Sequence, residues 1–227
     1  MHLLIIVLLL IAVILGPGLW VKRVMARYSE PNDRYPGTGG ELARHLLDSL
    51  RLEHVGTEET EIGDHYDPRK KVVRLSPENF SGRSLTAITV AAHEVGHALQ
   101  DAQGYAPLKW RSRLVQWVSP VEKVGAGLLM VAPFLLAVTR VPGIGLLTFL
   151  GGLVTLASST MIHFVTLPTE FDASFARAMP MLSKGGILRS EDEPHARRLL
   201  TAAALTYVSA SLMSLLNIAR WWAILRR

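Results

Sequence analysis

At residues 91–101 the chain reads Ala-Ala-His-Glu-Val-Gly-His-Ala-Leu-Gln-Asp, which contains the pattern His-Glu-x-x-His. Residues four apart share one face of an α-helix, so His93 and His97 are expected to reach a single metal ion together. Two histidines at this spacing are characteristic zinc ligands, and Glu94 is placed to act as general base on a metal-bound water. The pattern predicts a zinc hydrolase, most simply a peptidase, with Zn²⁺ as its cofactor.

Local signals around the motif set the expected secondary structure. A helix is predicted from Ser84 to about Gln103, because Gly104 is a good C-terminal stop. A second helix is expected from Thr38 to Leu50, and residues 71–76 alternate like a half-buried strand. That strand either pairs with an extended substrate along its main chain or is an ordinary sheet strand, and the sequence leaves both open.

Composition favours a membrane protein with a modest polar part. Hydrophobic residues make up 49% of the 227 residues, the mean hydropathy is +0.27, and the apolar residues gather in blocks. The net charge of +5 comes largely from Lys and Arg beside those blocks, which argues against a nucleic-acid-binding surface. The chain has no cysteine, which excludes disulfides and cysteine-ligated metal.

The apolar blocks predict membrane spans. Residues 3–21 form an uninterrupted apolar run, long enough to cross a hydrocarbon core of roughly 30 Å, and Lys22-Arg23 follow it. An uncleaved anchor is favoured over a signal peptide, and the charge bias places the residues after it in the cytoplasm. Residues 124–138 and 144–165 flank a turn and predict a transmembrane hairpin.

The expected fold class is therefore a mainly α membrane protein, with a zincin-like His-Glu-x-x-His helix, a small β element and three to four transmembrane helices. It would lie in the bacterial cell membrane, with the lipid bilayer as a partner and the active site on the cytoplasmic side. The expected parts are an N-terminal transmembrane anchor at 1–21, a zincin-like catalytic part at 22–123, the transmembrane hairpin at 124–165, a segment carrying the third zinc ligand at 166–201, and a C-terminal membrane or membrane-packed helix at 202–227.

A catalytic zinc needs a third protein ligand from outside the motif helix. Glu170 is the best candidate, since Pro168 suits the first turn of a helix and places Glu170 near its start. Asp172 is the alternative on the same turn. Three histidines are weaker candidates: His65, His163 and His195.

Other parts of the site are less well defined by spacing. Tyr207 or Arg177 would serve as a donor to the developing oxyanion. Asp101, one turn beyond His97, is a candidate to orient a ligand histidine.

Taken together, the motifs resemble those of the bacterial neutral zinc metallopeptidases of the YugP type. The resemblance covers nearly the whole chain and rests on AAHEVGHA at 91–98, YDP at 66–68, VRLS at 73–76, TLPTEFDAS at 166–174 and AAALTYV at 202–208. It implies a membrane zinc peptidase. The segment at 170–174 is also similar to the Glu-x-x-Ala-Asp segment of membrane peptidases related to HtpX and the CAAX-processing protease. That likeness implies Glu170 as third ligand, although Ser174 stands where those proteins have Asp.

The function predicted is a membrane-bound zinc endopeptidase that cleaves polypeptides, with membrane or membrane-adjacent proteins as its substrates. Two alternatives remain. One is a site-2-type intramembrane protease, against which the polar residues of the motif helix and the lack of a Leu-Asp-Gly motif argue. The other is a non-catalytic zinc-binding membrane scaffold or quality-control factor, which would not need Glu94.

Overall fold

The computed structural model describes residues 2–139, 143, 146–148, 150–152 and 166–206. By their contacts the residues of the chain form two units. The first comprises residues 1–18, 110–166 and 207–227, and its described part is helical, with the first part of α1 (His2–Tyr28) and most of α5 (Ala106–Thr139). The second comprises residues 19–109 and 167–206 and holds every candidate metal ligand that the structure describes.

The prediction of three to four transmembrane helices is wrong for the residues that the structure describes. A span needs about 20 consecutive, predominantly apolar helical residues. Among the described residues no helix combines the length and the apolar character needed to cross a membrane. Most of the predicted hairpin arm at 144–165, and all of 207–227, lie outside the described residues. The other half of the predicted fold class is confirmed, since the chain is mainly helical with one small sheet.

The helices of the second unit begin where capping residues lie. The helix α2 (Gly39–Ser49) starts after Thr38, whose hydroxyl accepts from the Glu41 amide at 3.1 Å while the Glu41 carboxylate accepts from the Thr38 amide at 2.8 Å. The motif helix α4 (Leu85–Ala102) starts after Ser84, whose hydroxyl accepts from the Ala87 amide. Both helices were predicted from the sequence to within about a residue.

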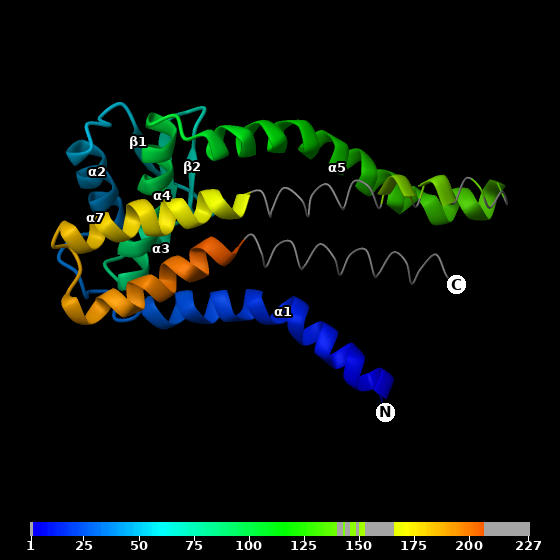
Figure 1. Ribbon diagram of the computed structural model, residues 1–227, viewed down its shortest axis with the longest axis horizontal. Helices are drawn as coiled ribbons and strands as arrows, with labels where there is room; N and C mark the ends of the chain where they lie inside the picture. Colours follow the sequence, from blue (N-terminus) through cyan, green and yellow to red (C-terminus); the bar gives the residue numbers. More distant parts are fainter. Residues whose placement is uncertain (1, 140–142, 144–145, 149, 153–165, 207–227) are drawn as a thin grey trace. The chain divides into compact units, whose positions relative to one another are not determined.

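A three-stranded sheet lies beside α4, with strand order β1-β3-β2 (Figure 1). The strands are β1 (Gly56–Glu59), β2 (His65–Asp67) and β3 (Val72–Leu75), and β3 pairs in parallel with β1 and antiparallel with β2. The predicted strand at 71–76 is thus the central one. Because both of its edges are paired, it has no edge on which an extended substrate could add, and the edge-addition hypothesis for this strand is wrong.

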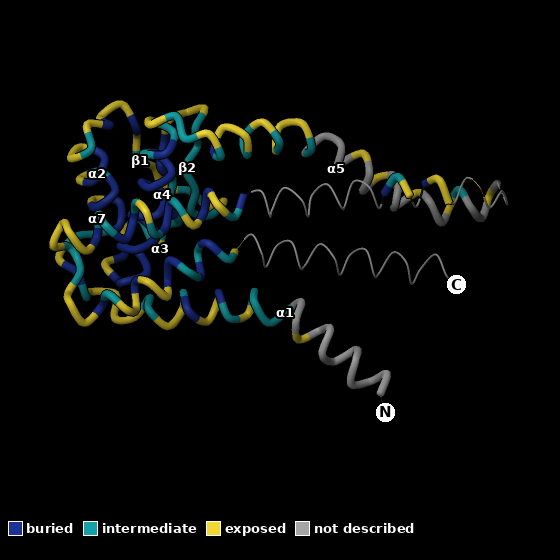
Figure 2. Tube along the Cα trace, viewed as in Figure 1, coloured by how far each residue is buried: buried dark blue, intermediate teal, exposed yellow. Residues whose placement is uncertain are grey.

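The core of the second unit gathers around α4, where Figure 2 shows mostly buried chain. The helix packs against α2, the short helix α3 (Pro77–Phe80), the sheet and the segment after residue 166. The fully buried residues come from α2, β3, α4 and the segment after residue 166, and include Leu47, Val73, Leu75, Ala91, Ala92, Val95, Leu182, Leu199 and Leu200. Each large apolar side chain removed from water contributes about 1.5–3 kcal/mol, so this packing fixes α4 against its neighbours.

The segment after residue 166 is helical but irregular. Residues 166–171 are α-helical, Asp172–Ala178 form a π-helical stretch (η1), and α7 (Met179–Lys184) continues the same helix. This segment passes close to α4 at Gly96, where the Cβ of a substituted alanine would lie only 2.7 Å from the Ala173 carbonyl oxygen. The glycine therefore allows the two backbones to come almost into contact.

A buried ion pair fastens the end of this segment. Asp192, in the short 3-10 turn η2 (Ser190–Asp192), is 1% exposed. It accepts from Arg34 at 2.6 and 2.7 Å and from the Tyr35 hydroxyl at 2.6 Å. Burial raises the pKa of Asp192, but the hydrogen bonds from Arg34 and Tyr35 outweigh it and leave that pKa below its usual range. The contact ties helical residues 193–206 to the start of the unit.

Candidate metal centre

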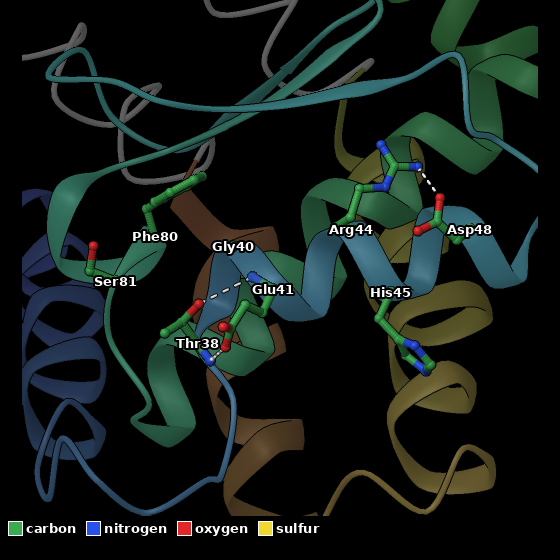
Figure 3. Close-up of a pocket in the computed structure, with 8 residues that line it drawn as sticks. All are labelled: Thr38, Gly40, Glu41, Arg44, His45, Asp48, Phe80 and Ser81. Atoms are coloured by element: carbon green, nitrogen blue, oxygen red, sulfur yellow. Dashed lines mark hydrogen bonds and ion pairs between the residues drawn. The ribbon is translucent and has the colours of Figure 1, made fainter.

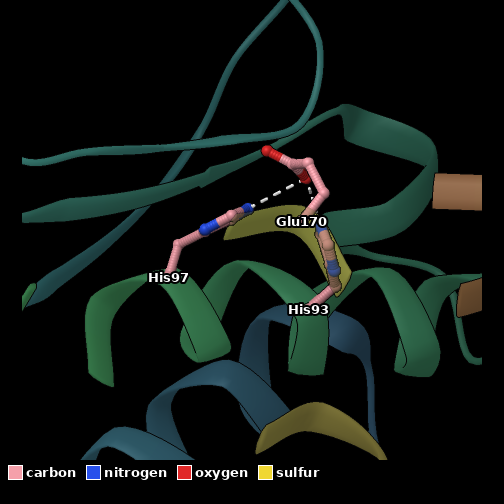
Figure 4. A group of neighbouring side chains, drawn as sticks. All are labelled: His93, His97 and Glu170. Carbon is pink, nitrogen blue, oxygen red and sulfur yellow. Dashed lines mark hydrogen bonds and ion pairs between the residues drawn. The ribbon is translucent and has the colours of Figure 1, made fainter. Parts of the chain in front are cut away.

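His93 and His97 lie one turn apart on the face of α4 that meets the segment after residue 166. Both are buried, and their rings meet edge to face with centroids 4.8 Å apart. Glu170, 1% exposed, reaches over them from the helical residues 166–171 (Figure 4). Its Oε2 atom lies 3.2 Å from His93 Nε2 and 3.3 Å from His97 Nε2. One ligand atom from each of the three residues therefore lies within 4.8 Å of the other two.

Nδ1 of His97, the ring nitrogen that does not face Glu170, contacts the side chain of Gln100. The Gln100 amide nitrogen donates to the Thr169 carbonyl at 2.8 Å and to Asp172 Oδ2 at 2.7 Å, so its Oε1 is the atom that faces the ring. Oε1 lies 2.9 Å from His97 Nδ1. Since an amide oxygen only accepts, the hydrogen-bond network assigns a proton to Nδ1 of His97.

Ser174 does the same for His93. Its hydroxyl donates to the Leu200 carbonyl at 3.3 Å and lies 3.1 Å from His93 Nδ1. With its proton committed to the carbonyl, the hydroxyl accepts from Nδ1–H of His93. In both neutral rings the lone pair is then on Nε2, the atom that faces Glu170.

Three electron-pair donors thus converge in a buried space. Burial raises the pKa of the Glu170 carboxyl. When the imidazoles also carry a proton on Nε2, the positive charge of His97 and the hydrogen bonds from His93 and His97 outweigh burial and hold that pKa far below its usual range. Glu170 is accordingly a candidate anionic ligand. Two imidazole nitrogens and a carboxylate oxygen are the protein ligands of catalytic zinc sites, with their second nitrogens held by outer groups. These residues fit a zinc ion.

Glu94, the predicted general base, follows His93 in α4 and is 7% exposed. The structure places the other two carboxylates that were considered away from the histidines. Asp172 pairs with Gln100 and Arg177, and Asp101 accepts from the Tyr66 hydroxyl at 2.7 Å and pairs with a lysine. The prediction that Asp101 orients a ligand histidine is therefore wrong, and the residue before it does so.

The remaining candidates lie elsewhere. Arg177, one of two predicted oxyanion donors, donates to Asp172 and Gln103. His65 contacts the Gly63 carbonyl, and His195 lies 3.0 Å from the Tyr28 hydroxyl. Tyr207 and His163 lie outside the described residues.

Sequence reasoning missed the orienting roles of Gln100 and Ser174, although the signal for each was present. Gln100 follows His97 by three residues and Ser174 follows Glu170 by four, and both spacings place side chains on one helix face. The only partner predicted for a ligand histidine was the charged side chain of Asp101, and the neutral amide of Gln100 was not considered.

A separate open groove of about 620 Å³ lies over α2 and the end of α3 (Figure 3). It contains the capping pair Thr38 and Glu41, an ion pair between Arg44 and Asp48, and one aromatic ring, Phe80. None of the three candidate ligands lines it, so the metal centre is distinct from this groove.

Comparison with known proteins agrees with zinc as the cofactor. A family model described as "putative neutral zinc metallopeptidase" matches residues 3–226. The chain is also 38% identical, over 213 residues, to the "putative membrane protease YugP" of Bacillus subtilis (strain 168), and the match covers 91% of each chain. No solved structure matches. The cofactor predicted from the motif, zinc, is that of the family, and the buried group of His93, His97 and Glu170 is able to hold it. With nearly its whole length matched, this chain belongs to the family of putative neutral zinc metallopeptidases.

Proposed function

We propose that the chain is a zinc-dependent endopeptidase in which His93, His97 and Glu170 hold the metal and Glu94 is the general base. The observation that supports it most is the position of Glu170 Oε2, at nearly equal distances of 3.2 and 3.3 Å from the two Nε2 atoms. Glu170 follows the two histidines by 77 and 73 residues, and residues so far apart converge on one buried point only when the fold brings them there.

The chemistry follows from the side chains. Zinc in such a site lowers the pKa of a coordinated water to about 7 and polarises a carbonyl. Glu94, one residue from a ligand and largely shielded from solvent, takes the proton of the attacking water and delivers it to the leaving amine. Burial of His93 and His97 strengthens each of these electrostatic interactions by lowering the local dielectric.

The substrate class follows from the family, since a peptidase acts on polypeptides. The relative from Bacillus subtilis is named a "putative membrane protease". For this chain we extend that name to the proposal that it works at the bacterial membrane, with its site facing the cytoplasm and membrane or membrane-adjacent proteins as substrates. Fractionation of cells and protease accessibility of the site from each face test this proposal, and recovery away from the membrane would contradict it.

The test of the activity uses the purified full-length protein with a fluorogenic peptide library and an unfolded protein as substrates. Cleavage should need one zinc per chain, stop on chelation and return with zinc. The variant Glu94→Gln should keep the zinc and lose turnover, because its amide accepts no proton. Equal cleavage by the variant would refute the proposal, and zinc binding without cleavage of any substrate would favour the non-catalytic scaffold instead.

A further inference from the structure

The hydrogen bond that orients His97 does not end at Gln100. The amide nitrogen of Gln100 donates to Asp172 Oδ2, and the same oxygen accepts from Arg177 Nε at 2.7 Å. A second guanidinium nitrogen of Arg177 donates to Gln103 Oε1 at 2.6 Å. The side chains of Asp172 and Arg177 are 21% and 11% exposed. An almost buried chain of contacts therefore runs from the imidazole of His97 to a guanidinium group.

The π-helical stretch makes this chain of contacts possible. Asp172 and Arg177 are five residues apart, and in an α-helix of 3.6 residues per turn they would point roughly 140° away from each other. In a π-helix the hydrogen-bonded repeat is five residues, so the two side chains rise from nearly the same face. The π-helical residues Asp172–Ala178 thus begin at the carboxylate and include the arginine that it binds.

The two histidines are supported in different ways. The orienting partner of His93, Ser174, donates to a backbone carbonyl, that of Leu200, and no charged group takes part. His97 depends on an amide whose orientation is set by its acceptors, one of which is a carboxylate. Without a cation beside it, that carboxylate is drawn toward solvent, and the amide loses one of the two contacts that keep its oxygen on the ring.

We propose that Arg177 is a positioning residue for the metal centre. By holding Asp172 against Gln100, it keeps the amide oxygen on Nδ1 of His97, and so keeps Nε2 aimed at the metal position. The proposal rests on the proposed function in one respect, namely that His97 is a zinc ligand. Outer groups of this kind change metal affinity by about 10- to 100-fold when they are removed from a ligand histidine.

The test compares zinc-loaded full-length protein with Arg177→Met, after ¹⁵N labelling of histidine. Competition with a chelator measures zinc affinity, and NMR measures how fast each Nδ1 proton exchanges with water. Arg177→Met should bind zinc about 10-fold more weakly. The His97 proton should exchange faster, and that of His93 should not. Ser174→Ala assigns the two signals, because it disturbs only His93.

The matched control is Arg74→Met. Arg74 also binds an aspartate, Asp67, at 3.0 Å and its side chain is 16% exposed, but it lies in the sheet and takes no part in these contacts. Arg74→Met should change neither the zinc affinity nor the exchange rate of either histidine proton. Arg177→Lys, which keeps the charge beside Asp172, should recover part of the affinity.

The inference would be overturned if Arg177→Met kept a zinc affinity within twofold of the unaltered protein and an unchanged exchange rate of the His97 proton. An equal rise in the exchange rates of the His93 and His97 protons would also overturn it, because it would mean that Arg177 has a structural role only. If Arg177→Met does not fold, Arg177→Gln provides the same comparison, because it removes the cation beside Asp172 and leaves a polar side chain at this position. Failure of the unaltered protein to bind zinc would instead remove the proposed function, and the inference with it.

Discussion

Gly96 sets how closely the segment that carries Glu170 approaches the motif helix, and Gly96→Ala should move it away. An alanine Cβ at this position would lie 2.7 Å from the Ala173 carbonyl oxygen, whereas ordinary contact begins at 3.4 Å, so η1 must retreat by about 0.7 Å. The obstructing atom is backbone, and no side-chain rotation relieves it. Glu170 precedes Ala173 by three residues in the same helix and should retreat with it.

The expected effect on zinc is large because metal ligands tolerate little displacement. Ligand distances in zinc sites hold to about 0.2 Å, so a shift of about 0.7 Å is several times the tolerance. Zinc affinity should fall by about 10- to 100-fold, and kcat/KM by about 100-fold, as for comparable displacements of catalytic groups. The free energy of unfolding should change less. Overpacking costs about 1–3 kcal/mol, and alanine returns about 1 kcal/mol of helix propensity, which leaves a net loss of about 0–2 kcal/mol.

The assay measures zinc affinity by chelator competition, peptide cleavage, and urea unfolding of the metal-free protein, for the unaltered chain and for Gly96→Ala. Gly127→Ala is the matched control, since Gly127 also lies inside a helix, α5, and a Cβ there meets nothing within 4 Å. That variant should keep full activity and be more stable by up to about 1 kcal/mol. Zinc affinity and kcat/KM of Gly96→Ala within twofold of the unaltered protein would refute the reasoning.

Three further predictions concern single carboxylates. Glu94→Gln should lower kcat by about 100- to 10,000-fold with zinc still bound, as measured by stopped assay and metal analysis, since only the general base is lost. Glu170→Gln should weaken zinc binding because a neutral amide replaces an anionic ligand, and retention of tight, stoichiometric zinc in that variant would exclude Glu170 as a ligand. Asp192 has its pKa lowered in the folded state, so its contribution to stability is complete well above its ordinary pKa of 3.8 and is lost as the pH falls through that value toward the lowered one. Asp192→Asn should therefore flatten the acid limb of the unfolding free energy below about pH 5, and an identical limb in both proteins would argue against the ion pair with Arg34.

Much of the local structure was predictable because it depends on residues only a few positions apart. Ser84 caps α4 through the amide of Ala87, Thr38 and Glu41 cap each other, and both contacts span three residues. The candidate ligand pair His93 and His97 follows in the same way from the helical repeat. Glu170 could be proposed as the third ligand from the sequence because few carboxylates lie near the start of a helix beyond the motif.

Contacts between distant segments were not predictable in the same way. The central position of β3 depends on which strands pair with it, and strand pairing is decided by the whole sheet. Whether Asp101 or Gln100 supports His97 depends on what lies beside each of them. Asp101 contacts Tyr66 of β2. Gln100 contacts Thr169 and Asp172, which lie more than sixty residues away in the sequence.

The sequence by itself determined the motif helix, its caps, two of the candidate ligands and the family. The tertiary structure decided how the third candidate ligand, Glu170, approaches the histidines, which groups orient them, and the π-helical register that joins Asp172 to Arg177. It also overturned the transmembrane helices expected from the apolar blocks, among the residues it describes. The physical reason is the distance along the sequence over which each interaction acts. Capping and helical periodicity act within four residues, whereas the centre is assembled across 73 to 81 residues by packing, and packing depends on shapes that no local pattern records.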